Sequence, residues 1–150
     1  MHVEGEMVHI GLVACSRKKR TSADEAKNLY NSGLFVKSRA FVEQRCDSWF
    51  ILSAKHGLVE PTDVIGPYEE ALGKKSRKER DEWANRVWSV LRQRLSPGDY
   101  VTILAGERYR ERLVPLIQQH GCRVDVPMQG LGIGLQLQWL SRQIERAHRG

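Results

Sequence analysis

Short apolar runs that end in polar residues recur along the chain, and each has the length of a buried strand. Three are clear, namely residues 9–15 (HIGLVAC), 49–53 (WFILS) and 100–106 (YVTILAG), and residues 123–128 (RVDVPM) form a weaker fourth. Apolar runs of this length that lack polar alternation are typical of parallel strands buried on both faces of a sheet.

Four segments between and after these strands have the periodicity of helices. They cover residues 22–46, 76–95, 107–121 and 131–148. The first is expected to contain two helices separated at Asn31–Gly33, and the third to continue through Pro115. In the second, one apolar stripe consists of Trp83, Val87, Val90 and Leu91.

Strands that alternate with helices predict an α/β fold. We expect residues 1–150 to form a single domain around a mostly parallel central sheet of about four strands, with helices on both faces. The chain has 150 residues, of which 41% are hydrophobic, so it is long enough for one core and short for two domains.

The charge balance adds a preference for anionic partners. Lys and Arg number 24 against 18 Asp and Glu, which gives a formal net charge of +6 at pH 7. Such an excess favours nucleic acid or a nucleotide as ligand, although charge by itself does not select between them.

Several other classes of protein are disfavoured. No apolar run approaches the roughly 20 residues that span a bilayer, and the first residues, MHVEGEMVHIG, lack the basic-then-apolar order of a signal peptide. Cys15, Cys46 and Cys122 form no CxxC pair, which argues against a disulfide framework and a cysteine zinc site. We expect a cytoplasmic protein with no membrane association and no bound metal, and the sequence does not indicate its oligomeric state.

The polar residues that follow the predicted strands are the candidates for chemistry. Parallel sheets bind ligands outside the carboxyl ends of their strands, where the connecting loops meet. The segments concerned are residues 15–20, 53–57, 106–109 and 127–134. All four are therefore expected on one rim of the molecule.

The first of these segments, CSRKKR, predicts an anion site. Ser16 and nearby backbone N–H groups would face a phosphate, and Lys19 would supply charge. The alternative is a solvated basic loop. A tyrosine-phosphatase loop has five residues between its cysteine and arginine, whereas only four separate Cys15 from Arg20, so we interpret Cys15 as a binding residue at a strand end.

The second segment, SAKHG, is the strongest candidate for catalysis. His56 titrates near neutral pH and would act as a general acid or base, or as a neutral donor to a leaving group. Lys55 would stabilise developing negative charge, Ser53 would bind substrate, and Gly57 permits a sharp turn near a ligand. Solvated side chains at the end of a strand are the alternative.

The following stretch, DVIGPYEEAL, supplies further candidates. Tyr68 would stack on a base, and Asp63 or Glu69 would be the catalytic carboxylate. Glu69 and Glu70 also suit the first turn of a helix, where acids are favoured, which is the alternative for at least one of them.

Other predicted contacts come from the remaining segments. The candidates for substrate or phosphate binding are Lys37, Arg39, Gly106, Tyr109 and Gln136. Gln136 belongs to the stretch MQGLGIGLQLQWL, residues 128–140, whose glycines do not fit the GxGxxG dinucleotide motif, so we expect no cofactor.

Several of these motifs together resemble a family of small bacterial and phage domains of unknown function. The shared features are a C-S/G-x-x-K loop, an L-Y-x-S-x-L-F-x-K-x-R helix and an L-S-A-K-H-G-L strand end, and the likeness runs from about residue 10 to 140. The sequence is more distantly similar to the YaaA peroxide-stress proteins, which bind DNA, and through them to uracil-DNA-glycosylase-like folds. This second similarity implies DNA rather than RNA as partner, as an analogy of fold.

The leading hypothesis is a nucleic-acid base-processing enzyme, most simply a DNA-glycosylase-like hydrolase of an N-glycosidic bond. Two alternatives stay open. One is a DNA- or nucleic-acid-binding module without catalysis, and the other is a nucleotide or deoxynucleoside transferase that acts on small metabolites.

Overall fold

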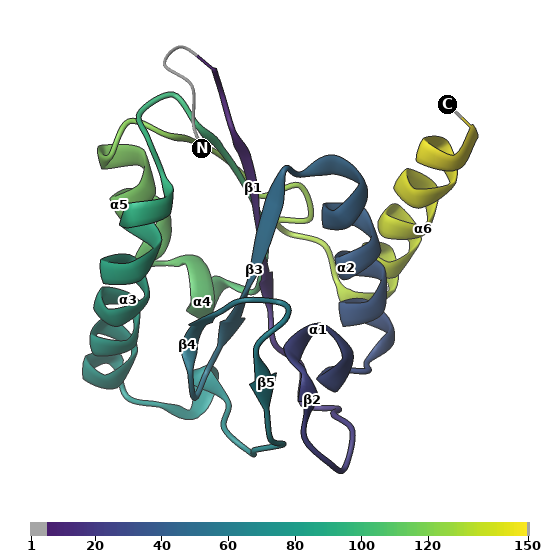
Figure 1. The fold of residues 1–150 in the computed structure, drawn as a ribbon, viewed down its shortest axis with the longest axis horizontal. Coiled ribbons are helices and arrows are strands. Elements are labelled where there is room, and N and C mark those ends of the chain that lie inside the picture. The colour runs from purple at the N-terminus through teal and green to yellow at the C-terminus, as the bar shows by residue number, and fades with distance from the viewer. Residues whose placement is uncertain (1–5, 150) are drawn as a thin grey trace.

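Five strands form one central sheet in the order β4-β3-β1-β6-β7 (Figure 1). In chain order they are β1 (His9–Ala14), β3 (Ser48–Ser53), β4 (Gly57–Val59), β6 (Tyr100–Leu104) and β7 (Arg123–Asp125). All neighbouring pairs are parallel except β3 and β4, which are antiparallel. The predicted mostly parallel sheet is therefore confirmed, and β4 is an additional strand.

This computed structural model describes residues 6–149, with side chains as far as Ala147. Residues 1–5, the first part of the segment in which we expect no signal peptide, lie outside the described residues. Within residues 6–149, no helix has both the length and the apolar character needed to cross a membrane.

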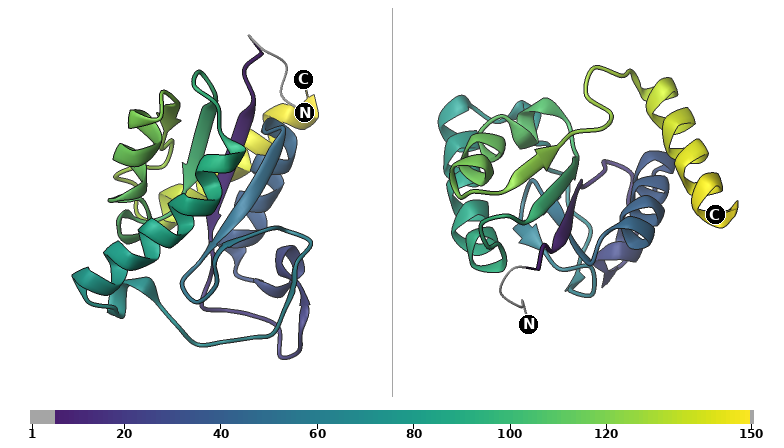
Figure 2. Two further views of the ribbon diagram at one scale, coloured as in Figure 1. Left: turned by 60° about the vertical axis from the view of Figure 1, so that its left-hand side comes forward. Right: turned by 90° about the horizontal axis from the view of Figure 1, so that it is seen from above.

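Helices cover both faces of the sheet, as predicted (Figures 1 and 2). One face carries α3 (Arg77–Leu91), α4 (Glu107–Arg110) and α5 (Leu113–Gln119), and the other carries α1 (Ala26–Leu29) and α2 (Gly33–Arg45). α6 (Ile133–Arg149) packs mainly on α2 and forms the outermost layer, at the right of the second view in Figure 2.

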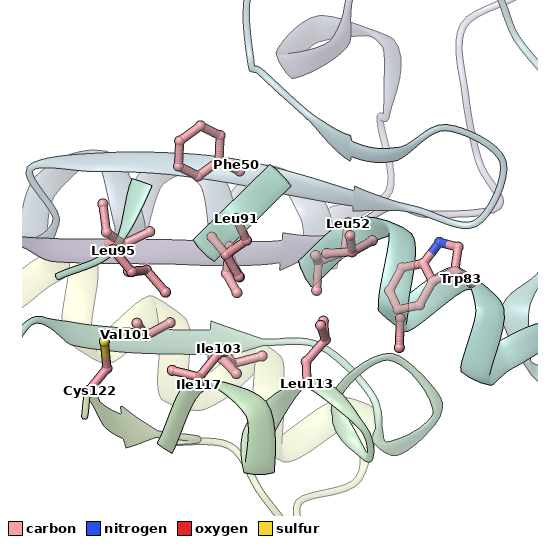
Figure 3. Close-up of a cluster of buried hydrophobic side chains, with 14 of the residues drawn as sticks. Phe50, Leu52, Trp83, Leu91, Leu95, Val101, Ile103, Leu113, Ile117 and Cys122 are labelled. Atoms are coloured by element: carbon pink, nitrogen blue, oxygen red, sulfur yellow. The ribbon is translucent and has the colours of Figure 1, made fainter. Parts of the chain in front are cut away.

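Successive residues of each strand point to opposite faces, which divides the core into two clusters. In β1, Leu12 belongs to the cluster beneath α3 and α5, and Val13 belongs to the cluster beneath α2. Figure 3 shows the first cluster, where Leu91 and Ile117 of the helices lie against Ile103 of β6.

α2 approaches β1 closely because β1 carries a glycine. A Cβ atom added to Gly11 would lie 2.8 Å from Val42 Cγ1 and 3.1 Å from Cys46 Sγ. These distances are shorter than ordinary van der Waals contact, so any side chain at residue 11 would push α2 away from the sheet.

The predicted stripe of α3 is partly correct. The helix begins with a capping box between Ser76 and Glu79. Trp83, Val87 and Leu91 are buried as predicted, but Val90 is 48% exposed. Val90 is one residue, or about 100° of helix rotation, from Leu91, and this places it beyond the edge of the buried face.

Residues 107–121 form two helices instead of the single helix predicted. α4 ends at Arg110, α5 begins at Leu113, and residues 111–112 form a turn between them. Pro115 has no backbone N–H, and in a continuous helix its ring would clash with the carbonyl of Glu111. The break places Pro115 in the first turn of α5, where no N–H donor is needed.

Other short elements were not predicted from the sequence. They are β2 (Asp24–Glu25), which pairs with β5 (Val64–Ile65), and the 3₁₀ turns Leu72–Lys74 and Arg92–Arg94. The weak fourth strand is also shorter than predicted. It ends at Asp125 because turns follow, with Gln129 N donating to Val126 O and Leu131 N to Met128 O, each at 3.1 Å.

Candidate functional site

The chain changes direction across the sheet between β1 and β6. From β1 it runs to β3 on one side, and then returns through α3 to β6 on the other side of β1. In open α/β sheets, ligands bind at the carboxyl ends of the strands at such a switch point. A cavity of about 320 Å³ lies at this place, and we call it the switch-point cavity.

The walls of the switch-point cavity come from several distant parts of the chain. These are the ends of β1 and β6, helix α4, the segment after β7, and the starts of α2 and α6. Val13, Phe35, Leu104 and Met128 give the cavity apolar walls. Its polar groups include Ser16, Ser32, Ser38, Glu107, Arg110 and Gln136.

Glu107 is an acidic residue that lines this cavity. It is the first residue of α4, directly after Gly106, which itself lines the cavity at the end of β6. Within residues 6–149, no ion pair or side-chain hydrogen bond occupies the Glu107 carboxylate. Arg110, at the other end of α4, donates from Nε to Ala105 O at 3.3 Å. The lining of the cavity therefore includes an exposed acidic residue and a half-buried basic residue three positions apart.

The end of β1 forms another wall. Cys15 N donates to Leu52 O at 2.9 Å, which continues the pairing of β1 with β3. Ser16 Oγ donates to Lys18 O at 2.7 Å and so fixes the following turn. Cys15 Sγ lies 3.4 Å from the hydroxyl of Tyr109, and burial raises the pKa of Tyr109, which keeps this hydroxyl protonated.

On the other side of Cys15 lies a hydrogen-bonded chain of hydroxyl groups. Tyr68 OH is 2.6 Å from Tyr30 OH and 2.6 Å from Ser53 Oγ, and the backbone N of His56 donates to Ser53 Oγ at 3.0 Å. Burial raises the pKa of Tyr30 to about 12 and also raises the pKa of Tyr68, so both phenols are neutral. We call Tyr30, Ser53 and Tyr68 the tyrosine cluster.

Cationic side chains surround the tyrosine cluster. Lys19 Nζ lies 4.4 Å from the centre of the Tyr68 ring, and Lys55 Nζ lies 5.9 Å from it. Burial lowers the pKa of Lys19, although Cys15 and Glu69 oppose this effect. Cations over an aromatic ring are attracted by its negative face. Lys19 and Glu69 also line a second pocket of about 250 Å³ beside the cluster.

The segment SAKHG forms the turn of a hairpin between β3 and β4. Gly57 has a φ of +75°, which other residues rarely adopt, and it lets β4 turn back along β3. Lys55 and His56 are exposed at this turn, and the His56 ring makes an edge contact with Tyr68 at 5.3 Å. Burial, followed by the charge of Lys55, lowers the pKa of His56.

The chain belongs to a family of unknown function, DUF6884. The family profile matches residues 10–142, which include both the switch-point cavity and the tyrosine cluster. The expected membership of an uncharacterised family is therefore confirmed.

A related protein shares almost the whole length of this DUF6884 chain. It is the uncharacterized protein YfjM of Bacillus subtilis (strain 168), which is 27% identical over 156 residues. The similarity covers 95% of this chain and 99% of YfjM.

The structure of this DUF6884 chain divides the predicted site residues into three groups. Cys15, Ser16, Gly106 and Gln136 line the switch-point cavity, with Tyr109 beside Cys15. Ser53 and Tyr68 belong to the tyrosine cluster, and four further predicted residues lie beside it, namely Lys19, Lys55, His56 and Glu69. Cys15 lies between the two groups, since it lines the cavity and also acts electrostatically on Tyr30, Tyr68 and Lys19.

The third group lies away from both places. Lys37 donates to Ser141 Oγ at 2.7 Å, which ties α2 to α6. Arg39 donates to Lys27 O and Asn28 Oδ1, each at 2.9 Å, and therefore holds α1. Asp63 accepts from Glu60 N at 3.0 Å in an exposed turn.

Two residues have surroundings other than those the sequence suggested. Tyr68 is 8% exposed, and its ring is covered by Lys19 and His56, so it has no free face on which a base could stack. Glu69 lies in an irregular segment and not in the first turn of a helix, which was the alternative considered for it.

Two residues that line the switch-point cavity, Ser38 and Glu107, were not predicted as site residues from the sequence. Glu107 could have been found, because it is the first carboxylate after β6.

Proposed function

We propose that this protein is an enzyme that hydrolyses the N-glycosidic bond of a nucleotide or of a nucleic-acid base. The observation that carries the proposal is the switch-point cavity, whose lining combines apolar side chains with Glu107 and Arg110. Apolar walls suit the faces of a base, and the charged groups suit the sugar and phosphate that bear it.

The reaction needs a negative charge near the sugar carbon. The C1′–N bond breaks with its electron pair on the base, which takes up a proton, and the oxygen of water forms the new bond to C1′. A carboxylate beside C1′ stabilises the oxocarbenium-like transition state and accepts a proton from water. Asp63 and Glu69 do not line the cavity, so we assign this role to Glu107 in their place.

Positive charges in the second pocket, beside the tyrosine cluster, support a phosphate-bearing substrate. Arg17, Lys19 and Lys74 line this pocket together with Glu69 and Glu70. Lys55 and His56 are proposed to contact the substrate from the side of the tyrosine cluster, where they would assist departure of the base. The distant similarity to YaaA proteins and uracil-DNA-glycosylase-like folds favours DNA over RNA, and a cytoplasmic location would suit this substrate.

A second candidate is a nucleotide or deoxynucleoside transferase. The size of the cavity favours it, because about 320 Å³ is near the lower end of the roughly 300–1,000 Å³ found for ligand pockets. A cavity of this size suits a mononucleotide, whose sugar would pass to a second base instead of to water.

Release of free base is the test of the proposal. The protein is incubated with normal and modified single- and double-stranded DNA, with RNA and with mononucleotides, and free bases are measured by mass spectrometry. We expect release from at least one substrate, and a Glu107→Gln variant should be slower by about 100-fold or more because it loses a proton acceptor.

Glu82→Gln is the matched control, since Glu82 is exposed on α3 and lines none of the described pockets. It should release base at the wild-type rate. Absence of release from every substrate, together with binding to DNA that weakens steeply with salt, would favour a binding module instead. Release that depends on a second free base would identify the transferase.

A further inference from the structure

The middle of α2 contains a buried serine, Ser38, whose hydroxyl group has no hydrogen-bond partner among the described residues but is not fully enclosed. Ser38 is 2% exposed and lines the switch-point cavity. No hydrogen bond of its Oγ occurs within residues 6–149. The other buried hydroxyl side chains are bonded, since Ser53 Oγ contacts Tyr68 and Thr102 Oγ1 contacts His9 at 2.7 Å.

The Ser38 hydroxyl is open to the cavity and has no protein partner. Nearly all enclosed polar groups in proteins are paired, and among the described residues the enclosed side-chain atom without a hydrogen bond is Glu25 Oε2 and not Ser38 Oγ, which therefore keeps accessible surface although the residue is buried. A serine in a helix commonly bonds to the carbonyl four residues earlier, but Ser38 makes no such bond to Leu34. Its hydroxyl is therefore available to a molecule inside the cavity.

Gln136 provides a second polar group with one free end. Its Nε2 donates to Leu131 O at 2.7 Å, and because a carbonyl can only accept, this bond fixes the orientation of the amide. Oε1 is then the end of Gln136 that a ligand can use, and it accepts a hydrogen bond. A ligand that satisfies it must present an N–H or O–H donor.

The surroundings of these two groups define the shape of the ligand. Phe35 and Ser38 are on the same helix, and Met128 and Leu131 follow β7, so apolar surfaces flank the polar groups. A planar heterocycle has two apolar faces to lie against such walls and a polar edge for Ser38 and Gln136. A nucleobase has this distribution of polarity, including an N–H donor on its pairing edge.

We propose that Ser38 and Gln136 form the base-recognition end of the switch-point cavity, with Ser38 as a residue that determines which base is bound. Gln136 Oε1 accepts from an N–H of the base edge, and Ser38 Oγ bonds the neighbouring polar atom of that edge. The inference rests on the proposed function for the class of ligand, but it requires binding and not catalysis.

The first test compares serine variants in binding and stability. Binding of nucleosides and of short oligonucleotides is measured by calorimetry, and unfolding by urea titration. Ser38→Ala should weaken binding about tenfold, because a buried hydrogen bond to the ligand is lost. It should leave the unliganded protein as stable as the wild type or more stable, because no internal bond is removed.

Two matched variants separate the effect on ligand binding from the effect on stability. Ser53→Ala removes a buried serine that is bonded to Tyr68, and it should lower the stability of the unliganded protein. Ser89→Ala removes an exposed serine of α3 that bonds Arg86 O at 2.7 Å, and it should leave binding unchanged. Loss of stability in Ser38→Ala as large as in Ser53→Ala would contradict a free hydroxyl.

The second test uses ligands with a blocked edge. The pairs are uridine with N3-methyluridine, guanosine with N1-methylguanosine, and adenosine and cytidine with their dimethylamino derivatives. The base that binds should lose affinity on methylation, and Ser38→Ala should add little further loss to the methylated ligand. Equal affinity of wild type and Ser38→Ala for every nucleoside and oligonucleotide, or no binding by the wild type, would overturn the inference.

The outcomes distinguish this inference from the proposed function. Binding that depends on Ser38 without any release of base would support base recognition and reject the hydrolase. Release of base that requires Glu107 but proceeds with unchanged KM and kcat in Ser38→Ala would support the hydrolase and reject the role of Ser38.

Discussion

At the scale of single residues, the proposed site depends on which polar groups are already paired. Ser16 and Tyr68 have partners within the protein, and their hydrogen bonds hold loops in place. The carboxylate of Glu107 and the hydroxyl of Ser38 have no hydrogen-bond partner among the described residues. Because pairing within the protein reduces what a group can offer a ligand, the latter two are the better candidates for contact with substrate.

The tyrosine cluster makes a prediction about stability at this scale. Tyr68→Phe keeps the ring but removes the hydroxyl that links Tyr30 and Ser53, each at 2.6 Å. We expect the free energy of unfolding to fall by about 1–2 kcal/mol, because two buried hydroxyls each lose a bond. Urea denaturation measures the change.

Tyr100→Phe is the control for that substitution. Tyr100 is half-buried on β6 and lies outside the tyrosine cluster, so the same chemical change should alter stability less. An equal decrease in the free energy of unfolding in the two variants would show that the hydrogen bonds of the tyrosine cluster do not stabilise the fold.

At the scale of secondary structure elements, the distance between α2 and β1 is fixed by Gly11. Gly11→Ala would introduce a Cβ 2.8 Å from Val42 Cγ1, and we expect a loss of about 1–3 kcal/mol in the free energy of unfolding from overpacking. Denaturation in urea checks this value.

Gly33→Ala is the matched control within α2. Gly33 is the first residue of the helix, and a Cβ added there would meet no atom within 4 Å. The free energy of unfolding of the Gly33→Ala variant should be unchanged or slightly higher, because alanine favours helix formation. A Gly11→Ala variant that is as stable as Gly33→Ala would mean that α2 can move away from the sheet without cost.

The elements also show where the sequence was sufficient for prediction. β1, β3 and β6 were predicted because apolar runs of five or six residues identify strands buried on both faces. β4 has only three residues, too few to show a periodicity, so its hairpin turn resembled an isolated active-site loop. The break between α4 and α5 follows from the exclusion of proline from helix interiors. It was not predicted because the residues on both sides of Pro115 have a helical pattern.

The same limits apply to the site. The strand-end rule placed Cys15, Ser16 and Gly106 at the cavity, because it needs only the order of strands and loops. Ser38 could not be found in this way. Whether a helical serine faces a cavity or a carbonyl depends on packing between distant segments, here α2 with the ends of β1 and β6.

At the scale of the whole molecule, two histidines, the half-buried His9 and the exposed His56, make stability depend on pH. Burial lowers the pKa of His9 and of His56 from the ordinary value of 6.5. Between the lowered pKa and 6.5, the unfolded chain binds more protons than the folded one, so the free energy of unfolding rises with pH in this window. We therefore expect stability to fall as the pH is lowered through and below 6.5.

A double variant tests this dependence. Combining His9→Gln with His56→Asn removes both titrating groups, and the change in the midpoint of urea unfolding between about pH 7.5 and 5.5 should become smaller. His9→Gln keeps a side chain that can bond Thr102 Oγ1, the present partner of His9 at 2.7 Å. An unchanged pH profile would assign the dependence to other groups.

Both outer strands of the sheet, β4 and β7, have only three residues. A strand this short presents few unpaired backbone groups to a neighbouring chain, so edge-to-edge association between molecules is discouraged. An extended peptide would likewise find little backbone to pair with. Recognition of a macromolecule by this protein is therefore expected to depend on contacts from side chains and not on pairing with an edge of the sheet.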